Sequence, residues 1–208
     1  MYEFWKRGFD IAGAIILLIG IAPIMATVAL LTVIKLGRPV LFKQLRPGLH
    51  EKPFWIYKFR TMANLYDANG ELLPDGMRFT AFGGMIRKLS LDELPQLFNV
   101  LKGEMSLIGP RPLLPHYSPY YSVREKLRFT VRPGMTGLAQ ISGRNHLSWN
   151  ERLAFDIAYV EKLGWRLDFF IFGKTLLKVL RQEDVVANPA HHDLPLDRYR
   201  EWMKEGSL

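Results

Sequence analysis

The longest apolar segment of the sequence lies close to its N-terminus. From Ile11 to Ile34 no residue is charged, and this length matches the roughly 20 residues that a helix needs to cross a bilayer. Pro23 lies near the middle of the segment, where it lacks an N–H donor and clashes with the preceding turn, so we expect the helix to kink or break there. Each half would then be about 18 Å long, too short to cross a hydrocarbon core of about 30 Å.

Basic residues flank the apolar segment at both ends. Lys6 and Arg7 precede it, and Lys35 and Arg38 follow it. Cationic flanks favour the cytoplasmic side of a membrane, so both ends should stay on that side. We therefore predict that residues 1–38 form a re-entrant membrane anchor of two helices joined at a break. A gently kinked spanning helix stays an alternative, whereas a cleavable signal peptide is disfavoured because no small-residue cleavage site follows the segment.

The chain beyond the anchor has the pattern of a mixed, mostly helical domain. We assign residues 39–186 to one cytosol-facing catalytic domain, in which Pro and Gly separate short apolar segments. Short strands are expected at Val40–Phe42 and Phe54–Phe59, on either side of a turn at Arg46-Pro47-Gly48. This arrangement would place Lys58 beside the turn.

Two later segments have helical periodicity. Leu91–Leu101 places leucines on one face, and Asp168–Leu180 opposes phenylalanines and leucines to lysines. The second pattern is typical of a helix in a lipid interface and of a helix packed on a core, and the sequence leaves both open. Residues 187–208 lack clear periodicity, and the adjacent His191 and His192 are a poor metal signal without further ligands. We expect a solvated tail there.

Length and composition limit the domain organisation, the class of partner and the kinds of metal site. A chain of 208 residues suits one compact unit, so the anchor, the catalytic domain and the tail should form one integrated structure. The formal net charge of +8 indicates an anionic partner, which could be nucleic acid, anionic lipid or a phosphorylated substrate. The absence of cysteine excludes a disulfide framework and thiolate metal sites.

Two adjacent carboxylates, Asp92 and Glu93, follow Arg87 and precede an apolar helix. One interpretation is structural: Ser90 and Glu93 have the spacing of a capping box, and Asp92 would offset the helix dipole. In the other interpretation, helix N–H groups and Arg87 keep Asp92 ionised as a nucleophile on phosphorus, while Glu93 helps to hold a divalent cation. The stretch by itself favours capping.

Several cations in rigid settings could serve a phosphoryl transfer. Such a reaction needs Mg²⁺ on carboxylate oxygens together with Arg or Lys on the remaining oxygens. Arg111 lies between two prolines, which restrict its backbone and can aim its planar fork. Arg132 precedes a Pro-Gly pair, and Arg144 and Asn145 follow a glycine. These side chains are candidate substrate ligands, although each pattern also occurs in plain turns.

Five features in this order resemble the bacterial sugar transferase family, in particular its small monotopic phosphoglycosyl transferases. They are the proline-containing anchor, Tyr57-Lys58-Phe59-Arg60-Thr61-Met62, Leu91-Asp92-Glu93-Leu94-Pro95-Gln96, Gly109-Pro110-Arg111-Pro112 and Arg132-Pro133-Gly134-Met135-Thr136-Gly137. The similarity covers roughly Tyr2 to Arg181. It implies an α+β, mostly helical fold, in which a re-entrant helix-break-helix and interfacial amphipathic helices surround a small mixed catalytic core.

The resemblance also implies a reaction and roles for its residues. A nucleotide sugar, expected to be UDP-linked, would donate its sugar 1-phosphate to polyprenyl (undecaprenyl) phosphate, as the first membrane step of glycoconjugate or polysaccharide assembly. Asp92 matches the family nucleophile, and Glu93 matches its partner, which is associated with Mg²⁺. Arg111 matches an arginine linked to nucleotide-sugar recognition, and Lys58 and Arg87 fall where cations near the phosphates are expected.

The family comparison adds a location and one departure. The implied site is the cytoplasmic face of the bacterial inner membrane, in contact with membrane lipid. Well-known small members carry a serine before the anchor's proline, and its hydroxyl could serve a freed backbone carbonyl, whereas this chain has Ala22-Pro23. The departure concerns the support of the kink and leaves the catalytic motif untouched.

Two other functions fit parts of the sequence. A membrane-tethered binder of anionic lipid or nucleic acid would explain the net charge. It gives no role to the paired carboxylates and proline-locked turns, so we expect no nucleic-acid partner. A metal-dependent phosphohydrolase of lipid diphosphates could use the same carboxylates and cations to direct water.

Overall fold

The computed structural model describes residues 2–143, 147–181 and 194–205. Their helices and strands are α1 (Tyr2–Leu36), β1 (Leu41–Pro47), β2 (Pro53–Phe59), α2 (Asp75–Arg78), α3 (Ala81–Lys88), α4 (Gln96–Lys102), β3 (Ser106–Ile108), β4 (Gly134–Thr136), α5 (Leu138–Ser142), α6 (Trp149–Glu161), α7 (Trp165–Arg181) and α8 (Leu196–Glu205). Short 3₁₀ segments occupy Leu49–Glu51, Leu91–Glu93, Pro115–Tyr120 and Glu125–Thr130. The mostly helical α+β class predicted from the sequence is confirmed.

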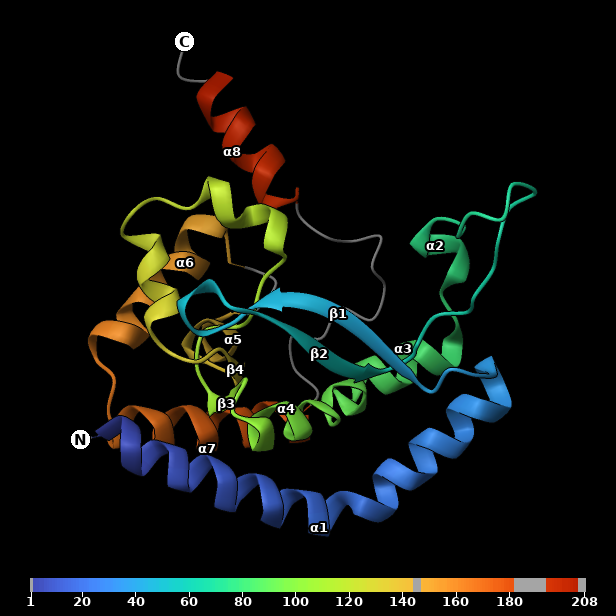
Figure 1. Cartoon of the computed structure of the whole chain (residues 1–208), viewed down its shortest axis with the longest axis horizontal. Coiled ribbons are helices and arrows are strands. Elements are labelled where there is room, and N and C mark those ends of the chain that lie inside the picture. Colours follow the sequence, from blue (N-terminus) through green and yellow to red (C-terminus); the bar gives the residue numbers. More distant parts are fainter. Residues whose placement is uncertain (1, 144–146, 182–193, 206–208) are drawn as a thin grey trace.

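Helix α1 is a single helix of 35 residues that continues through Pro23. The predicted break is therefore wrong, whereas Figure 1 shows that the helix is bent, with both arms rising towards the rest of the chain. Thr27 Oγ1 donates to the carbonyl of Pro23 at 2.9 Å, and Thr32 Oγ1 donates to that of Val28 at 2.7 Å. Such bonds back to the preceding turn favour bending, so the second arm supplies hydroxyls although Ala22 has none.

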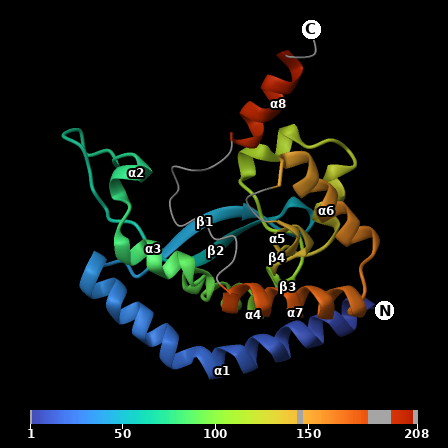
Figure 2. The same cartoon turned by 180° about the vertical axis from the view of Figure 1, so that it is seen from behind.

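The surface of α1 indicates membrane association. Its most apolar window has a mean hydropathy of 2.7, and only 11% of that window is buried by the rest of the chain. By length and composition the helix could cross a membrane. Helix α7 runs beside the N-terminal arm of α1 in both views (Figures 1 and 2). It also exposes apolar side chains, among them Phe169, Phe170 and Leu176.

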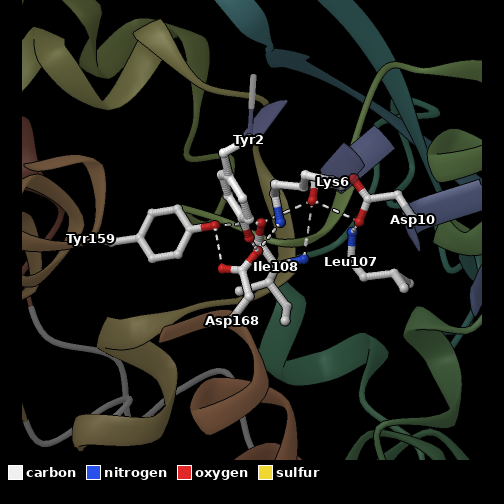
Figure 3. A network of polar contacts seen from close by, with 8 residues as sticks. Tyr2, Lys6, Asp10, Leu107, Ile108, Tyr159 and Asp168 are labelled. Atoms are coloured by element: carbon white, nitrogen blue, oxygen red, sulfur yellow. Dashed lines mark hydrogen bonds and ion pairs between the residues drawn. The ribbon is translucent and has the colours of Figure 1, made fainter. Parts of the chain in front are cut away.

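A polar network fixes the N-terminal arm of α1 to its neighbours (Figure 3). The Asp168 carboxylate of α7 accepts hydrogen bonds from Tyr2 Oη at 2.5 Å and from Lys6 Nζ. Further along α1, Asp10 accepts from the backbone N–H of Leu107 in β3 at 2.9 Å. Both carboxylates are almost wholly buried, and buried charges need such partners. The network therefore fixes the arm of α1 against α7 and β3.

Strands β1 and β2 form an antiparallel hairpin whose register runs from Leu41 opposite Phe59 to Pro47 opposite Pro53. The predicted strands are confirmed, but Lys58 pairs with Phe42 at the end far from the turn. The expectation that Lys58 lies beside the turn is wrong, because the strands are longer than expected and the turn lies between Pro47 and Pro53. Side chains alternate across a strand, so Lys58 lies on the same face of β2 as the buried Phe54 and Ile56.

The second sheet pairs β3 with β4 in parallel, with Ser106 opposite Gly134. Gly109, just after β3, donates its N–H to the carbonyl of Thr136 at 2.8 Å. A Cβ atom added to Gly134 would lie 2.0 Å from the backbone nitrogen of Gly109. Only glycine permits this close approach, which sets the position of the loop that follows β3.

The C-terminal segment differs from the expected solvated tail. Leu196 is fully buried and packs in a cluster with Trp149 and Leu153 of α6. Trp149 Nε1 also donates to the carbonyl of Leu194 at 2.8 Å. For residues 194–205 the prediction is wrong, because a short helix buries its first apolar residue against the catalytic domain. His191 and His192 lie outside the described residues.

Candidate active site

A partly buried carboxylate, that of Glu93, contacts cations from two distant segments of the chain. Glu93 lies in the 3₁₀ segment Leu91–Glu93, and its Oε1 accepts from Lys58 Nζ of β2 at 2.7 Å. Arg111, from the loop after β3, donates Nη2 to the same oxygen and Nη1 to Oε2 at 3.2 Å. The Glu93 side chain is 18% exposed. The fork of Arg111 and the ammonium of Lys58 together enclose the Glu93 carboxylate.

The capping-box interpretation of this stretch is wrong. Ser90 adopts a left-handed backbone conformation (φ 55°), and its side chain makes no capping hydrogen bond. Helix α4 begins at Gln96, after Pro95, so Glu93 lies before the helix and turns towards Lys58 and Arg111. The spacing of Ser90 and Glu93 reflects a 3₁₀ turn, in which the glutamate is free to serve an ion cluster.

Electrostatics distinguish the two carboxylates. Burial by itself would raise the pKa of Glu93, but Arg111 and Lys58 outweigh it and hold that pKa well below its usual range. Burial and the charge of Glu93 raise the pKa of Asp92 to about 6, although Lys58, Arg111 and Arg87 act in the opposite direction. Both groups are therefore mainly ionised at neutral pH, and Asp92 is the one that titrates close to it.

The Asp92 carboxylate differs from that of Glu93 in its contacts. Among the described residues, no donor lies within hydrogen-bond distance of its carboxylate. Its cationic support is electrostatic and comes from Lys58, then Arg111, then Arg87. Arg87 Nε donates to Thr61 Oγ1 at 2.9 Å. Arg87 acts on the pKa of Asp92 in the predicted direction, and its role beside the substrate phosphates stays a prediction. An ionised carboxylate without a fixed partner can act as a nucleophile.

Of the other predicted ligands, Arg132 makes its hydrogen bond outside this cluster. Arg132 Nε donates to the carbonyl of Gly103 at 2.9 Å, at the C-terminal end of α4, whereas the carboxylates precede its N-terminus. In this structure Arg132 satisfies a helix-end carbonyl, and its role towards substrate stays a prediction. Arg144 and Asn145 lie outside the described residues. The anchor residue Pro23 lies within α1.

Sequence reasoning missed one cation of the site. Arg46, which the sequence pattern assigned to a turn, lies in β1 and donates Nη1 to the carbonyl of Pro112 at 3.2 Å. Burial, and then the charge of Arg111, lower the pKa of Arg46 to about 10. The alternation of β1 was a signal, because Gln44 and Arg46 share a face with Lys58 of β2.

The charges of the site suit an anionic ligand. Four cations surround two carboxylates, Asp92 and Glu93; the cations are Lys58, Arg87, Arg111 and Arg46. Among the residues that the structure describes, no three acidic or histidine side chains form a metal-binding group. Asp92 and Oε2 of Glu93, which accepts a single hydrogen bond, could offer oxygen ligands to Mg²⁺, which commonly binds one or two carboxylates and completes its shell with water and substrate phosphates.

Comparison with known proteins shows the family to which the chain belongs. The bacterial sugar transferase family model matches residues 1–182. A similar protein is the uncharacterized sugar transferase EpsL of Bacillus subtilis (strain 168), with 51% identity over 86% of this chain and 89% of EpsL. The chain belongs to the bacterial sugar transferase family, which confirms the resemblance found in its motifs. It is accordingly an enzyme of the sugar transferase class.

Two relatives have more specific names. The undecaprenyl-phosphate galactose phosphotransferase of Salmonella typhimurium is 41% identical over 87% of this chain. The UDP-N-acetylgalactosamine-undecaprenyl-phosphate N-acetylgalactosaminephosphotransferase of Aeromonas hydrophila is 38% identical over 86% of it. The matches cover 41% and 44% of these two proteins, so the chain spans less than half of their lengths.

We expect Glu93→Gln to lower the pKa of Asp92. The substitution removes the neighbouring negative charge and leaves Lys58 and Arg111 without their main anionic partner, so ionised Asp92 becomes more favourable. The ¹³C NMR titration of the Asp92 carboxyl should move from about 6 to lower pH by about 1 pH unit. Glu161→Gln, at an exposed position, should leave the midpoint unchanged. An unchanged or raised midpoint in Glu93→Gln would contradict an ionised Glu93 beside Asp92.

Proposed function

We propose that this chain transfers a sugar 1-phosphate from a nucleotide sugar to polyprenyl phosphate through a covalent intermediate on Asp92. The observation that carries the proposal is the pairing of an unclamped, ionised Asp92 with a Glu93 that two cations hold. The names of the Salmonella and Aeromonas relatives supply the acceptor class, undecaprenyl phosphate, and the Aeromonas name supplies a UDP-linked donor. The contacts around Asp92 and Glu93 support Asp92 as the reacting group.

In the first half-reaction an oxygen of Asp92 attacks the phosphorus that bears the sugar. A bond forms between this oxygen and phosphorus, and the bond from phosphorus to the bridging diphosphate oxygen breaks. The nucleoside monophosphate leaves with the electron pair of that bond. Lys58 and Arg111 lie where they can offset charge on the phosphate oxygens, and Arg87 supports the ionised nucleophile.

In the second half-reaction a phosphate oxygen of the polyprenyl phosphate attacks the same phosphorus. The bond to Asp92 breaks, its carboxylate is regenerated, and a polyprenyl diphosphate sugar is released. Mg²⁺, held by Asp92 and Glu93 with the substrate phosphates, would supply further neutralisation of charge. The product would start the assembly of a glycoconjugate or polysaccharide on the membrane.

The apolar surface supports a membrane location for this chemistry. The exposed apolar side chains of α1 and of α7 lie on neighbouring helices, and a polyprenyl acceptor is itself anchored in lipid. We infer a re-entrant anchor in the bacterial inner membrane, with the catalytic domain on the cytoplasmic face. The bend of α1 supports this topology, because both of its arms lean towards the catalytic domain (Figure 1).

Asp92→Asn should abolish the covalent intermediate, because an amide is not a nucleophile of comparable strength towards phosphorus. The purified chain is incubated with Mg²⁺ and a panel of UDP-sugars without acceptor, and intact mass is measured. The unaltered chain should gain the mass of one phosphosugar, and Asp92→Asn should show none. Asp75→Asn, at an exposed carboxylate outside the cluster, should form the adduct normally. An adduct on Asp92→Asn at the normal level would contradict the proposal.

The acceptor separates a transferase from a hydrolase. With radiolabelled donor, label should move to polyprenyl phosphate and little free sugar phosphate should form in its absence. Equal release of free sugar phosphate with and without acceptor would favour the lipid diphosphate phosphohydrolase. A tethered binder of anionic lipid would show neither adduct nor turnover.

A re-entrant α1 predicts that both of its ends face the same side of the membrane. The sequence has no cysteine, so Glu3→Cys and Arg38→Cys each introduce a single thiol at an exposed position. A membrane-impermeant maleimide should label both variants in inverted inner-membrane vesicles and neither in intact spheroplasts. Labelling of one variant in each preparation would instead show a spanning helix.

A further inference from the structure

A buried arginine outside the ion cluster holds the backbone of Arg111. Arg128, in the 3₁₀ segment Glu125–Thr130, donates Nη2 to the carbonyl of Arg111 at 2.6 Å. The same nitrogen and Nε contact Asp156 Oδ2 of α6 at 2.8 and 3.2 Å. Nη1 completes the set with the hydroxyl of Tyr121 at 3.2 Å. All three guanidinium nitrogens are therefore occupied.

The depth of this ion pair calls for an explanation. The side chains of Arg128 and Asp156 are 2% and 3% exposed. Burying two charges is costly, and a buried pair is often no more stabilising than well-packed apolar residues of similar volume. What apolar side chains could not do is donate to the carbonyl of Arg111. The fork of Arg128 does this while Asp156 fixes its orientation.

The whole loop after β3 is held in the same way. The carbonyls of three consecutive residues each accept a hydrogen bond from a different segment: Pro110 from the N–H of Gly134 at 3.0 Å, Arg111 from Arg128, and Pro112 from Arg46 at 3.2 Å. The two prolines have fixed φ angles. The backbone on both sides of Arg111 is thus determined, and with it the direction from which its fork approaches Glu93.

We propose that Arg128, oriented by Asp156, is a positioning residue that sets the backbone of Arg111 and thereby its alignment with Glu93 and with the diphosphate of the donor. The inference rests on the proposed function, since it assumes that Arg111 contacts a nucleotide diphosphate. It assigns no contact between Arg128 and substrate. A planar fork recognises phosphate oxygens only when it is correctly oriented, so loss of the support should weaken binding through Arg111.

The test is a double-mutant cycle that measures binding of UDP to the full chain by calorimetry. Asp156→Asn is made in the unaltered chain and in Arg111→Ala. In the unaltered chain the substitution should raise the Kd for UDP about tenfold, and in Arg111→Ala less than about twofold, because the group that it orients is already absent. A general loss of structure would instead lower binding by the same factor in both backgrounds.

Two further variants sharpen the comparison. Arg124 and Glu161 also join the Glu125–Thr130 region to α6, at 3.1 Å, but their side chains are 72% and 48% exposed. Glu161→Gln should leave the Kd for UDP unchanged. Arg128→Lys keeps the positive charge beside Asp156 but cannot bond two groups in a fork, so it should repeat the effect of Asp156→Asn. If thermal unfolding shows that Asp156→Asn does not fold, Arg128→Lys takes its place in the double-mutant cycle.

The outcomes separate the inference from the proposed function. If the unaltered chain does not bind UDP, the proposed donor class fails, and the inference fails with it. If the unaltered chain binds UDP while Asp156→Asn and Arg128→Lys do so equally well, the positioning role alone is overturned. Equal weakening in both backgrounds would also overturn it, since the pair would then be purely structural.

Discussion

The site depends on the enclosure of one carboxylate, Glu93, by Lys58 and Arg111. These cations come from a hairpin strand and from the loop after β3, so the interaction fixes two segments of the fold around the 3₁₀ turn. Without them a half-buried glutamate would tend to take up a proton, because burial raises its pKa. With them it stays charged, and burial together with the charge of Glu93 raises the pKa of Asp92 to about 6. Two adjacent residues of similar chemistry thus acquire different roles from their environments.

The backbone beneath this cluster is unusually constrained for a loop. Gly109 and Gly134 pass so closely that a side chain at Gly134 would collide with the backbone. The carbonyls that follow are each bound by a separate segment, and prolines flank Arg111. The backbone that carries the Arg111 guanidinium therefore loses little conformational freedom when a ligand binds. Such preorganisation is a general route to affinity for a charged ligand. Rigidity at this loop and an unclamped Asp92 are complementary features of the site.

Much of this could be predicted from short patterns. The uncharged run from Ile11 to Ile34 predicted the apolar helix, and Pro23 predicted its bend. Apolar and β-branched pairs around Arg46-Pro47-Gly48 predicted the hairpin. The paired carboxylates and proline-bracketed Arg111 were found because motif and chemistry agreed. These features depend on local sequence, and the tertiary contacts of the folded chain leave them in place.

The errors arose where tertiary contacts decided the outcome. Ser90 and Glu93 had the spacing of a capping box. The carboxylate of Glu93 instead binds Lys58 and Arg111, two cations that are distant in sequence. The place of Arg46 beside the ion cluster was not predicted, because it depends on how β1 pairs with β2. The segment around Leu196 lacked a long periodic pattern, yet one buried leucine suffices to dock a short helix. The role of Arg132 towards substrate stays a prediction.

The most direct test of the central claim is the pH dependence of the first chemical step. The single-turnover rate of phosphosugar adduct formation by the unaltered chain is followed by intact mass between pH 5 and pH 8. Because the nucleophile must be ionised, the rate should be highest above the pKa of Asp92 and should fall as pH decreases through about 6. A rate that stays constant down to pH 5 would contradict a nucleophile whose pKa is raised by burial and by the charge of Glu93.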